Sequence, residues 1–343
     1  MINNAHNDNN TAGKKRPCSS WFEKLQARFS VPGLLLVAAL IGCSSSQNAT
    51  ASKPSPASVV NVPAAERSKI ADAALTQRFK SLCAGVDGEI GVAVVHVESD
   101  RMSDFQGLKQ LPLYSVYKLP LAITVLQEVE KKNLSLEKKV RVTPDDVAPG
   151  SQFNMDLWRR PVEKTVAELL EFSIVRSDNT SSDKLLQQIN GPAMVSERMR
   201  ALGFSNIDIK YSSREFASHR DKPNLGTASD LARLLAKLQK GELLQQPQFS
   251  LLFGFMERAR TGGERRLRAN LPAGTQVAEK TGTGDSTTND VGLITLPEGK
   301  GHLAMAVLIT GSKPSVEAQE KLIAELARAA YDSYVSSAAT NSH

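Results

Sequence analysis

The stretch SVYK at residues 115–118 opens an apolar segment whose pattern predicts a helix over residues 113–132. Residues three positions apart share a helix face, so the Ser115 hydroxyl and the Lys118 amine can meet. A lysine can activate a serine nucleophile if burial or nearby positive charge lowers the pKa of its amine. Free N–H groups at the helix start suit a developing oxyanion. This spacing alone is weak evidence, because two other serines also have a lysine three residues on.

Two further motifs occur once each. SDN at residues 177–179 follows a predicted apolar helix and precedes another, and KTGTG at residues 280–284 ends a strand-like run. Taken alone, the first is an ordinary helix cap and the second a polar strand end. Their order after residues 115–118 is what indicates a shared catalytic site.

Ser-x-x-Lys, Ser-Asp-Asn and Lys-Thr-Gly in this order resemble the signature of class A β-lactamases and penicillin-binding proteins. The chain resembles class A β-lactamases over roughly residues 66–336. TVAEL at 165–169, LPAGT at 271–275 and NDVG at 289–292 are also similar to that family. The resemblance implies a serine enzyme whose substrate is a small-molecule β-lactam.

The resemblance also implies catalytic roles for four residues. Ser115 would attack the β-lactam carbonyl and form an acyl-enzyme, and Lys118 would take part in proton transfer. Ser177 would pass a proton to the departing lactam nitrogen, while Lys280 would keep the site positive.

Binding roles follow in the same way. The backbone N–H groups of Ser115 and Thr283 would form the oxyanion hole. The residues expected to bind substrate are Asn179, Thr281, Gly282, Thr283 and Arg266. Arg266 matches a guanidinium position of one extended-spectrum branch. The alternative interpretation is that Arg266 is a solvated charge in the basic run at residues 264–268.

Hydrolysis of the acyl-enzyme needs a water molecule and a base, for which class A enzymes use a loop glutamate. The candidate is Glu215, followed four residues on by His219. The segment departs from the family pattern, because no proline follows Glu215, the loop is short and Arg214 is directly adjacent. The alternative is that Glu215 is a solvated loop charge.

Two other functions are compatible with these motifs. One is a D-alanyl-D-alanine peptidase, a penicillin-binding protein that acts on peptidoglycan stem peptides and loses its acyl group slowly. The other is a non-catalytic envelope lipoprotein that retains the scaffold for binding. Turnover of a penicillin separates the first from a β-lactamase, and substitution of Ser115 tests the second.

The composition excludes several classes of protein. The 343 residues are 41% hydrophobic and carry a formal net charge of +6, which is typical of a soluble globular chain. The basic residues are scattered or lie near the N-terminus, and no glycine-rich phosphate loop is present, so no nucleic-acid partner is expected. The cysteines and histidines lack metal-ligand spacing, so we expect no metal or other cofactor. We expect a monomer.

The N-terminus reads as an export signal. Basic residues precede an apolar run at 31–43, which is too short to span a bilayer. The tetrad LIGC at 40–43 resembles a bacterial lipobox, which implies a lipoprotein signal peptide over 1–42 and lipidation of Cys43. An uncleaved buried helix or signal anchor is the alternative. The expected location is the periplasm, with a membrane anchor in the outer rather than the inner membrane, because Ser44 stands where Asp would favour retention.

The remaining chain is predicted to form an α/β (α+β) domain. Residues 43–64 are rich in Ser, Ala and Pro and predict a flexible tether, and 337–343 predict a disordered tail. Between them, 65–336 form the catalytic domain, with strands at both chain ends and helices between. We therefore expect an antiparallel sheet built from both chain ends and flanked by helices, plus an all-helical lobe. The resemblance implies that the active site lies between them. The predicted strands are 88–97, 275–281, 288–296 and 302–311, and the predicted helices are 66–82, 113–132, 165–175, 179–189, 193–202, 227–240, 246–259 and 315–335.

Overall fold

A computed structural model describes residues 64–219 and 221–338. The predicted signal peptide, Cys43, nearly all of the predicted tether and the end of the predicted tail lie outside the described residues. Within the described residues no helix is both long enough and apolar enough to cross a membrane.

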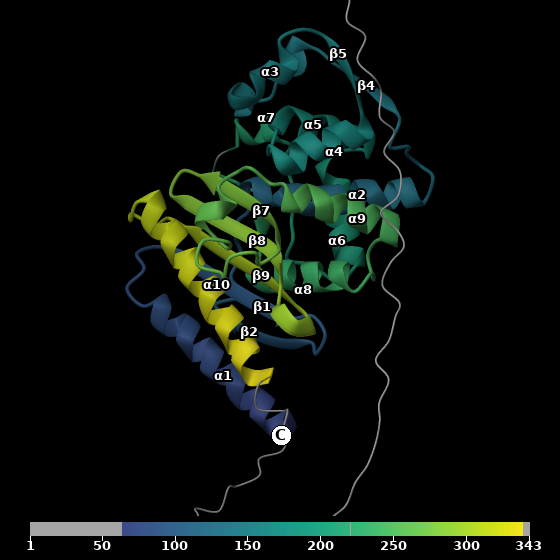
Figure 1. The fold of residues 1–343 in the computed structure, drawn as a ribbon. Coiled ribbons are helices and arrows are strands. Elements are labelled where there is room, and N and C mark those ends of the chain that lie inside the picture. Colours follow the sequence, from purple (N-terminus) through teal and green to yellow (C-terminus); the bar gives the residue numbers. More distant parts are fainter. Residues whose placement is uncertain (1–63, 220, 339–343) are drawn as a thin grey trace, which may run out of the picture. The chain divides into compact units, whose positions relative to one another are not determined.

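A five-stranded antiparallel sheet is the centre of the fold (Figure 1). Its strands, in spatial order, are β2 (Arg101–Phe105), β1 (Glu89–His96), β9 (His302–Thr310), β8 (Thr287–Thr295) and β7 (Val277–Gly284). The two chain ends meet where β1 pairs with β9, with Ile90 opposite Ile309. The prediction of an antiparallel sheet built from both ends of the chain is confirmed.

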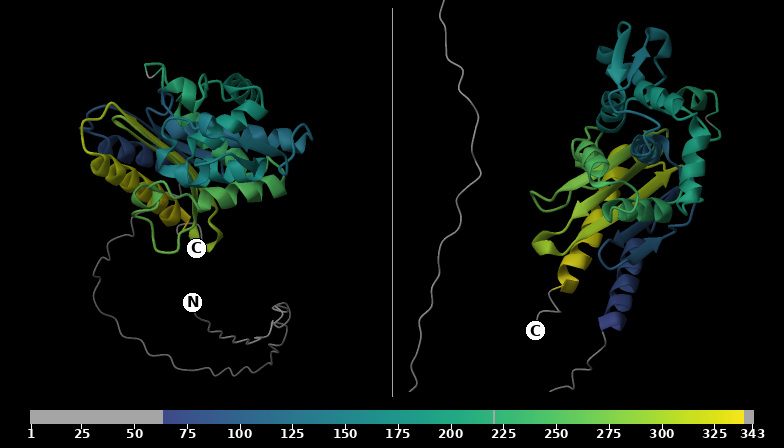
Figure 2. Two further views of the ribbon diagram at one scale, coloured as in Figure 1. Left: turned by 90° about the horizontal axis from the view of Figure 1, so that it is seen from above. Right: turned by 90° about the vertical axis from the view of Figure 1, so that its right-hand side faces the viewer.

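Helices cover both faces of this sheet, which explains why its central strands are apolar without alternation. On one face α1 (Ala64–Leu82) lies beside α10 (Val316–Ala338), and both pack on residues such as Val92 and Met305 (Figures 1 and 2). On the other face α8 (Ala228–Gln239) contacts β1 and β9. Alternate residues of β1 therefore belong to two different cores.

A helical lobe adjoins the α8 face and shares its hydrophobic core. Its longer helices are α2 (Lys118–Glu130), α4 (Val166–Val175), α5 (Asn179–Gln188), α6 (Pro192–Ala201) and α9 (Gln246–Glu257). The shorter elements of the chain are β3 (Leu111–Pro112), η1 (Tyr114–Tyr117), β4 (Lys139–Val142), η2 (Pro144–Asp146), η3 (Ser151–Asn154), α3 (Met155–Trp158), β5 (Val162–Thr165), α7 (Ser213–Phe216), β6 (Leu225–Gly226), η4 (Gly263–Arg265) and η5 (Pro297–Gly299).

The structure contains elements that the sequence did not predict, among them β3, β6, α3 and α7. The lobe is not entirely helical, because β4 and β5 pair as an antiparallel ribbon within it. β2 was not expected, since its five residues mix polar and apolar side chains without a clear period. The predicted tail from 337 is too long, because α10 continues to Ala338.

Candidate active site

Ser115 lies in η1, the single 3₁₀ turn that leads into α2. The preceding residue, Tyr114, has a positive φ of 44°. Strand β7 passes very close to this turn: a Cβ at Gly282 would lie 2.6 Å from the Leu113 carbonyl oxygen. Glycine is therefore required at this position of Lys-Thr-Gly, because any side chain would push the strand away from Ser115.

Lys118 lies next to Ser115 and is completely buried. Its Nζ donates to Ser115 Oγ at 3.1 Å, to Asn179 Oδ1 at 2.6 Å, and to the Ser177 carbonyl and hydroxyl oxygens at 2.6 and 3.2 Å. Burial lowers the pKa of the Lys118 amine to about 8, although the charges of Asp178 and Asp183 oppose that change. A substantial neutral fraction near pH 8 makes this amine a usable base.

Ser177 follows α4 and adopts a positive φ of 51°. Its neighbour Asp178 caps α5 by accepting from Ser181 N at 2.7 Å, and the same buried carboxylate accepts from Trp158 Nε1 at 3.1 Å. The helix-cap interpretation of Ser-Asp-Asn is thus correct for Asp178. The cap also positions the two flanking residues, Ser177 and Asn179, whose side chains accept hydrogen bonds from Lys118.

Lys280 approaches Ser177 from the opposite side, out of β7. Its Nζ donates to Ser177 Oγ at 3.1 Å and to the Thr281 carbonyl oxygen at 2.8 Å. Burial, and then the charge of Lys118, hold the pKa of Lys280 well below its usual value. One hydroxyl oxygen therefore accepts from both lysines and connects the helical lobe to the sheet.

Asn179 completes the group on the lobe side. While its Oδ1 accepts from Lys118, its Nδ2 donates to the Pro149 carbonyl oxygen at 2.6 Å. A Cβ at Gly150, which has a φ of 83°, would lie 2.5 Å from this Nδ2. The loop at Pro149 and Gly150 therefore contacts the amide directly.

Two cavities meet at Ser115, Gly150, Asn179 and Thr283. One, here called the α7 cavity, measures about 420 Å³ and includes Ser212, Ser213, Phe216 and Ala217 in its wall. The other, here called the arginine cavity, measures about 1040 Å³ and includes Arg176, Arg258, Arg260, Thr261 and Thr281. A substrate at Ser115 would extend into both.

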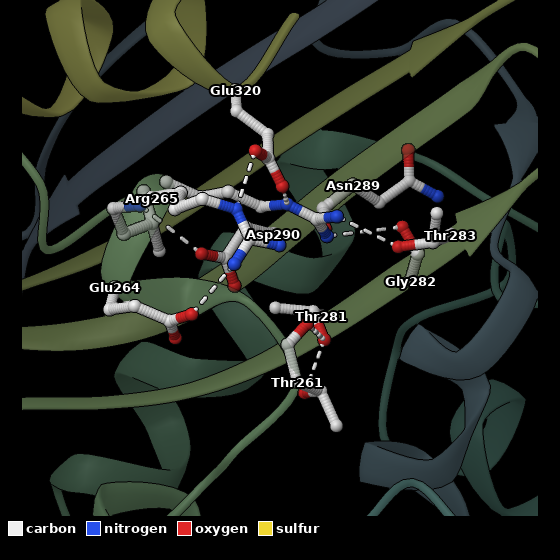
Figure 3. Close-up of polar contacts among 11 residues, drawn as sticks. Thr261, Glu264, Arg265, Thr281, Gly282, Thr283, Asn289, Asp290 and Glu320 are labelled. Atoms are coloured by element: carbon white, nitrogen blue, oxygen red, sulfur yellow. Dashed lines mark hydrogen bonds and ion pairs between the residues drawn. The ribbon is translucent and has the colours of Figure 1, made fainter. Parts of the chain in front are cut away.

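Arg266 is almost entirely buried, with 1% of its surface exposed, behind the open edge of β7. It donates to Thr283 Oγ1 at 2.8 Å and to the Asn289 carbonyl oxygen at 2.9 Å, and it pairs with Glu320 of α10 at 3.2 Å. Figure 3 shows Thr281 turned toward Thr261. Arg266 lines neither cavity, so its contact with the site passes through Thr283.

Glu215 is the one predicted catalytic residue that the structure does not bring to the others. It is exposed, and its Oε2 accepts from Ser212 N at 2.8 Å in a capping box at the start of α7. His219 stacks on Tyr211, and its Nδ1 lies 2.9 Å from the Glu215 carbonyl oxygen. The Ser-x-x-Glu spacing at residues 212–215 is a capping-box signal in the sequence.

Three residues near Ser115 were not expected from the sequence. The Tyr117 hydroxyl and Ser213 Oγ lie 2.9 Å apart in the wall of the α7 cavity. Buried Asp183 accepts from Ser213 N at 2.7 Å and from Arg214 N at 3.0 Å. Burial raises the pKa of the Asp183 carboxyl, and these N–H donors limit that rise. Only the fold reveals them, because residues 183 and 213 lie on separate elements.

The described residues contain no group of three or more His, Cys, Asp or Glu side chains that could hold a metal ion. The groups that meet around Ser115 are hydroxyl, amine and amide groups. This arrangement can perform acyl transfer through a serine ester.

The chain matches the model of the β-lactamase enzyme family over residues 74–334. It is 31% identical over 274 residues to β-lactamase VEB-1 of Pseudomonas aeruginosa, a match covering 76% of this chain and 90% of that protein. It is 30% identical over 273 residues to the extended-spectrum β-lactamase PER-1 of the same organism, covering 75% and 86%.

Solved structures give the same picture. The TLA-1 extended-spectrum β-lactamase superimposes with a TM-score of 0.73 at 31% identity, covering 77% of this chain and 99% of that one. A β-lactamase from Chitinophaga pinensis gives a TM-score of 0.72 at 30% identity, covering 76% and 98%.

Proposed function

The chain belongs to the β-lactamase enzyme family, as a class A member, and we propose that it opens β-lactam rings through an acyl-enzyme on Ser115 and hydrolyses that ester. The observation that carries the catalytic assignment is the meeting of Ser115, Lys118, Ser177 and Lys280 through hydrogen bonds of 3.1 to 3.2 Å. Such hydrolysis makes a bacterium resistant to the antibiotic.

Acylation would begin when Ser115 Oγ forms a bond to the lactam carbonyl carbon and its proton moves to neutral Lys118. The backbone N–H groups of Ser115 and Thr283 would stabilise the oxyanion. Support for this pairing comes from the close approach of β7 to η1 at Gly282.

The lactam C–N bond would then break, and the nitrogen would need a proton. Ser177 would deliver it, because its hydroxyl contacts Lys118, which holds the proton taken from Ser115. Lys280 donates to the same hydroxyl and would keep positive charge at the site. The proton lost by the nucleophile thus ends on the leaving nitrogen.

Substrate binding would use residues of β7 on one side of Ser115 and Asn179 of α5 on the other. Thr281 and Thr283, with Gly282 between them, would hold the substrate carboxylate at the edge of β7. Arg266 would support that carboxylate through its hydrogen bond to the Thr283 hydroxyl. Asn179 would bind the amide of the acylamino side chain.

Deacylation would use Glu215 as the base that activates water. Its carboxylate points to solvent in α7, whereas Ser213 and Phe216 of the same short helix line the α7 cavity. A rotation of this four-residue helix would turn the carboxylate toward the ester.

The outward position of Glu215 also favours one second function. A site that acylates but activates water poorly would behave as a penicillin-binding D-alanyl-D-alanine peptidase. A fluorescent penicillin separates the two: rapid loss of the label from the purified protein supports hydrolysis, whereas a label that persists for many minutes supports the peptidase. Ser115→Ala should abolish labelling. Ser135→Ala, at a second Ser-x-x-Lys, should leave it unchanged.

The protein would act after export to the periplasm as a monomer tethered by a lipid on Cys43. The LIGC tetrad at residues 40–43 supports this anchor. Radiolabelled palmitate should be incorporated into the wild-type protein and not into Cys43→Ser. Equal incorporation in both would contradict the anchor, and membrane fractionation would separate outer from inner membrane.

A further inference from the structure

The arginine cavity contains three guanidinium groups, of which two are already paired. Arg176 binds the Asp156 carboxylate through two bonds of 3.0 Å, and Arg258 binds Glu171 at 3.0 Å. Within the described parts of the chain, the Arg260 side chain makes no hydrogen bond or ion pair, and it is exposed. Arg260 therefore carries the uncompensated positive charge of this wall.

The backbone holds Arg260 beside the site proposed for the substrate. Its N–H donates to the Val175 carbonyl oxygen at 2.9 Å, which ties the segment to the end of α4. The next residue, Thr261, has its hydroxyl oxygen 2.5 Å from that of Thr281 (Figure 3). Arg260, Thr281 and Ser115 line one cavity.

The position of Arg260 suits a charge other than the ring carboxylate. Thr281 and Thr283 already stand at the edge of β7 for that carboxylate, with Arg266 behind Thr283. Arg260 lies further along the same wall, in a cavity of about 1040 Å³ that is larger than a single carboxylate needs. A positive charge that lines a cavity attracts anions more strongly than one on a flat surface.

We propose that Arg260 binds a second anionic group of the substrate, carried on the ring fused to the β-lactam. The inference rests on the proposed function, because it assumes that a β-lactam acylates Ser115. Thr281 lines the arginine cavity and not the α7 cavity, so a substituent on the carboxylate side of the ring extends toward Arg260. The preferred substrates are therefore dianionic β-lactams.

Two matched pairs of compounds test this assignment. In the first, two cephalosporins differ only by a carboxylate or a carboxamide on the ring substituent. In the second, the same exchange is made on the acylamino side chain. In the first pair, we expect Arg260→Gln to lower the ratio of kcat/KM for the anionic compound to kcat/KM for the neutral compound about three- to fivefold at low salt. In the second pair, the same ratio should not change.

Two variants serve as controls. Arg260→Lys should keep most of the preference for the anionic compound, because the substitution keeps the positive charge. Arg159→Gln removes the same charge from an exposed residue that lines neither cavity, and should leave the ratio unchanged. Rising salt should reduce the preference of the wild-type protein and not that of Arg260→Gln.

Three results would overturn the inference: an unchanged ratio in Arg260→Gln, an equal fall in Arg159→Gln, or an effect confined to the acylamino pair. If neither pair acylates the wild-type protein, the proposed function itself is wrong, and this inference with it.

Discussion

Lys118 and Lys280 meet at one oxygen atom: both ammonium groups donate to Oγ of Ser177, at 3.2 and 3.1 Å. Two buried amines in one small volume disfavour each other's protonation. That repulsion, added to burial, lowers the pKa of Lys280, while burial lowers that of Lys118. The site thereby gains a lysine that can act as a base close to neutral pH.

Acylation should accelerate as pH rises through about 8, the pKa of Lys118. Only the neutral amine accepts the Ser115 proton, so acylation at pH 7 should be about tenfold slower than on the alkaline plateau. Stopped-flow labelling with a fluorescent penicillin from pH 6 to 10 measures this profile. A flat profile would contradict Lys118 as the base.

Asp178→Asn should destabilise the fold by about 2–4 kcal/mol, because the buried carboxylate accepts from Trp158 and from Ser181. Losing its charge should also move the midpoint of the acylation profile to lower pH, since Asp178 raises the pKa of Lys118. Urea unfolding and the labelling rates measure the two effects. The control is Asp156→Asn, which removes the exposed ion pair between Asp156 and Arg176. This substitution should lower the free energy of unfolding by less than about 1 kcal/mol.

Gly282→Ala should slow acylation about 100-fold. The new methyl group would lie 2.6 Å from the Leu113 carbonyl oxygen, so β7 must move away from Ser115. Gly254→Ala in α9 is the matched control. There the nearest atom lies 3.5 Å away, and a stabilisation of about 0.5–1 kcal/mol is expected. Similar acylation rates in both variants would show that the approach of β7 is unimportant.

Glu215→Gln should trap the acyl-enzyme, lowering the deacylation rate about 10²- to 10⁴-fold while acylation continues. Mass spectrometry of the protein after mixing with a penicillin measures the trapped adduct. Glu163→Gln, an exposed carboxylate on β5, should turn over as the wild-type protein does. If Glu215→Gln deacylates normally, the water base lies elsewhere, and Asp183 behind Ser213 becomes the next residue to substitute.

The sequence predicted the part of the site that depends on local spacing. Ser115 and Lys118 share one turn, and their contact follows from helix geometry alone. The order of the three motifs, through the family resemblance, then indicated that Ser177 and Lys280 would join them. The long apolar runs of β1 and β9 made the sheet predictable for the same reason, since each of these strands carries its own signal.

The sequence failed where a distant element decides the environment. The basic run at residues 264–268 leaves open whether Arg266 binds substrate or is solvated, and the fold buries it against Glu320 of α10 and Thr283 of β7. Glu215 is a different case, because its carboxylate is held by the local capping box with Ser212. The spacing of residues 212 and 215 signals that cap, whereas the family resemblance implies a catalytic role for the same residue. The ribbon of β4 and β5 is too short to give a clear period.

The central sheet is complete only when β1 pairs with β9, where Ile90 lies opposite Ile309. The central strand of the sheet, β9, is the last of its five strands in chain order, so β1 and β8 have no neighbour between them until β9 has been synthesised. Such late closure delays completion of the sheet until β9 is present. It also makes the exposed strands of an incomplete chain prone to aggregation. Deletion of β9 and α10 should therefore yield insoluble protein rather than a smaller stable domain.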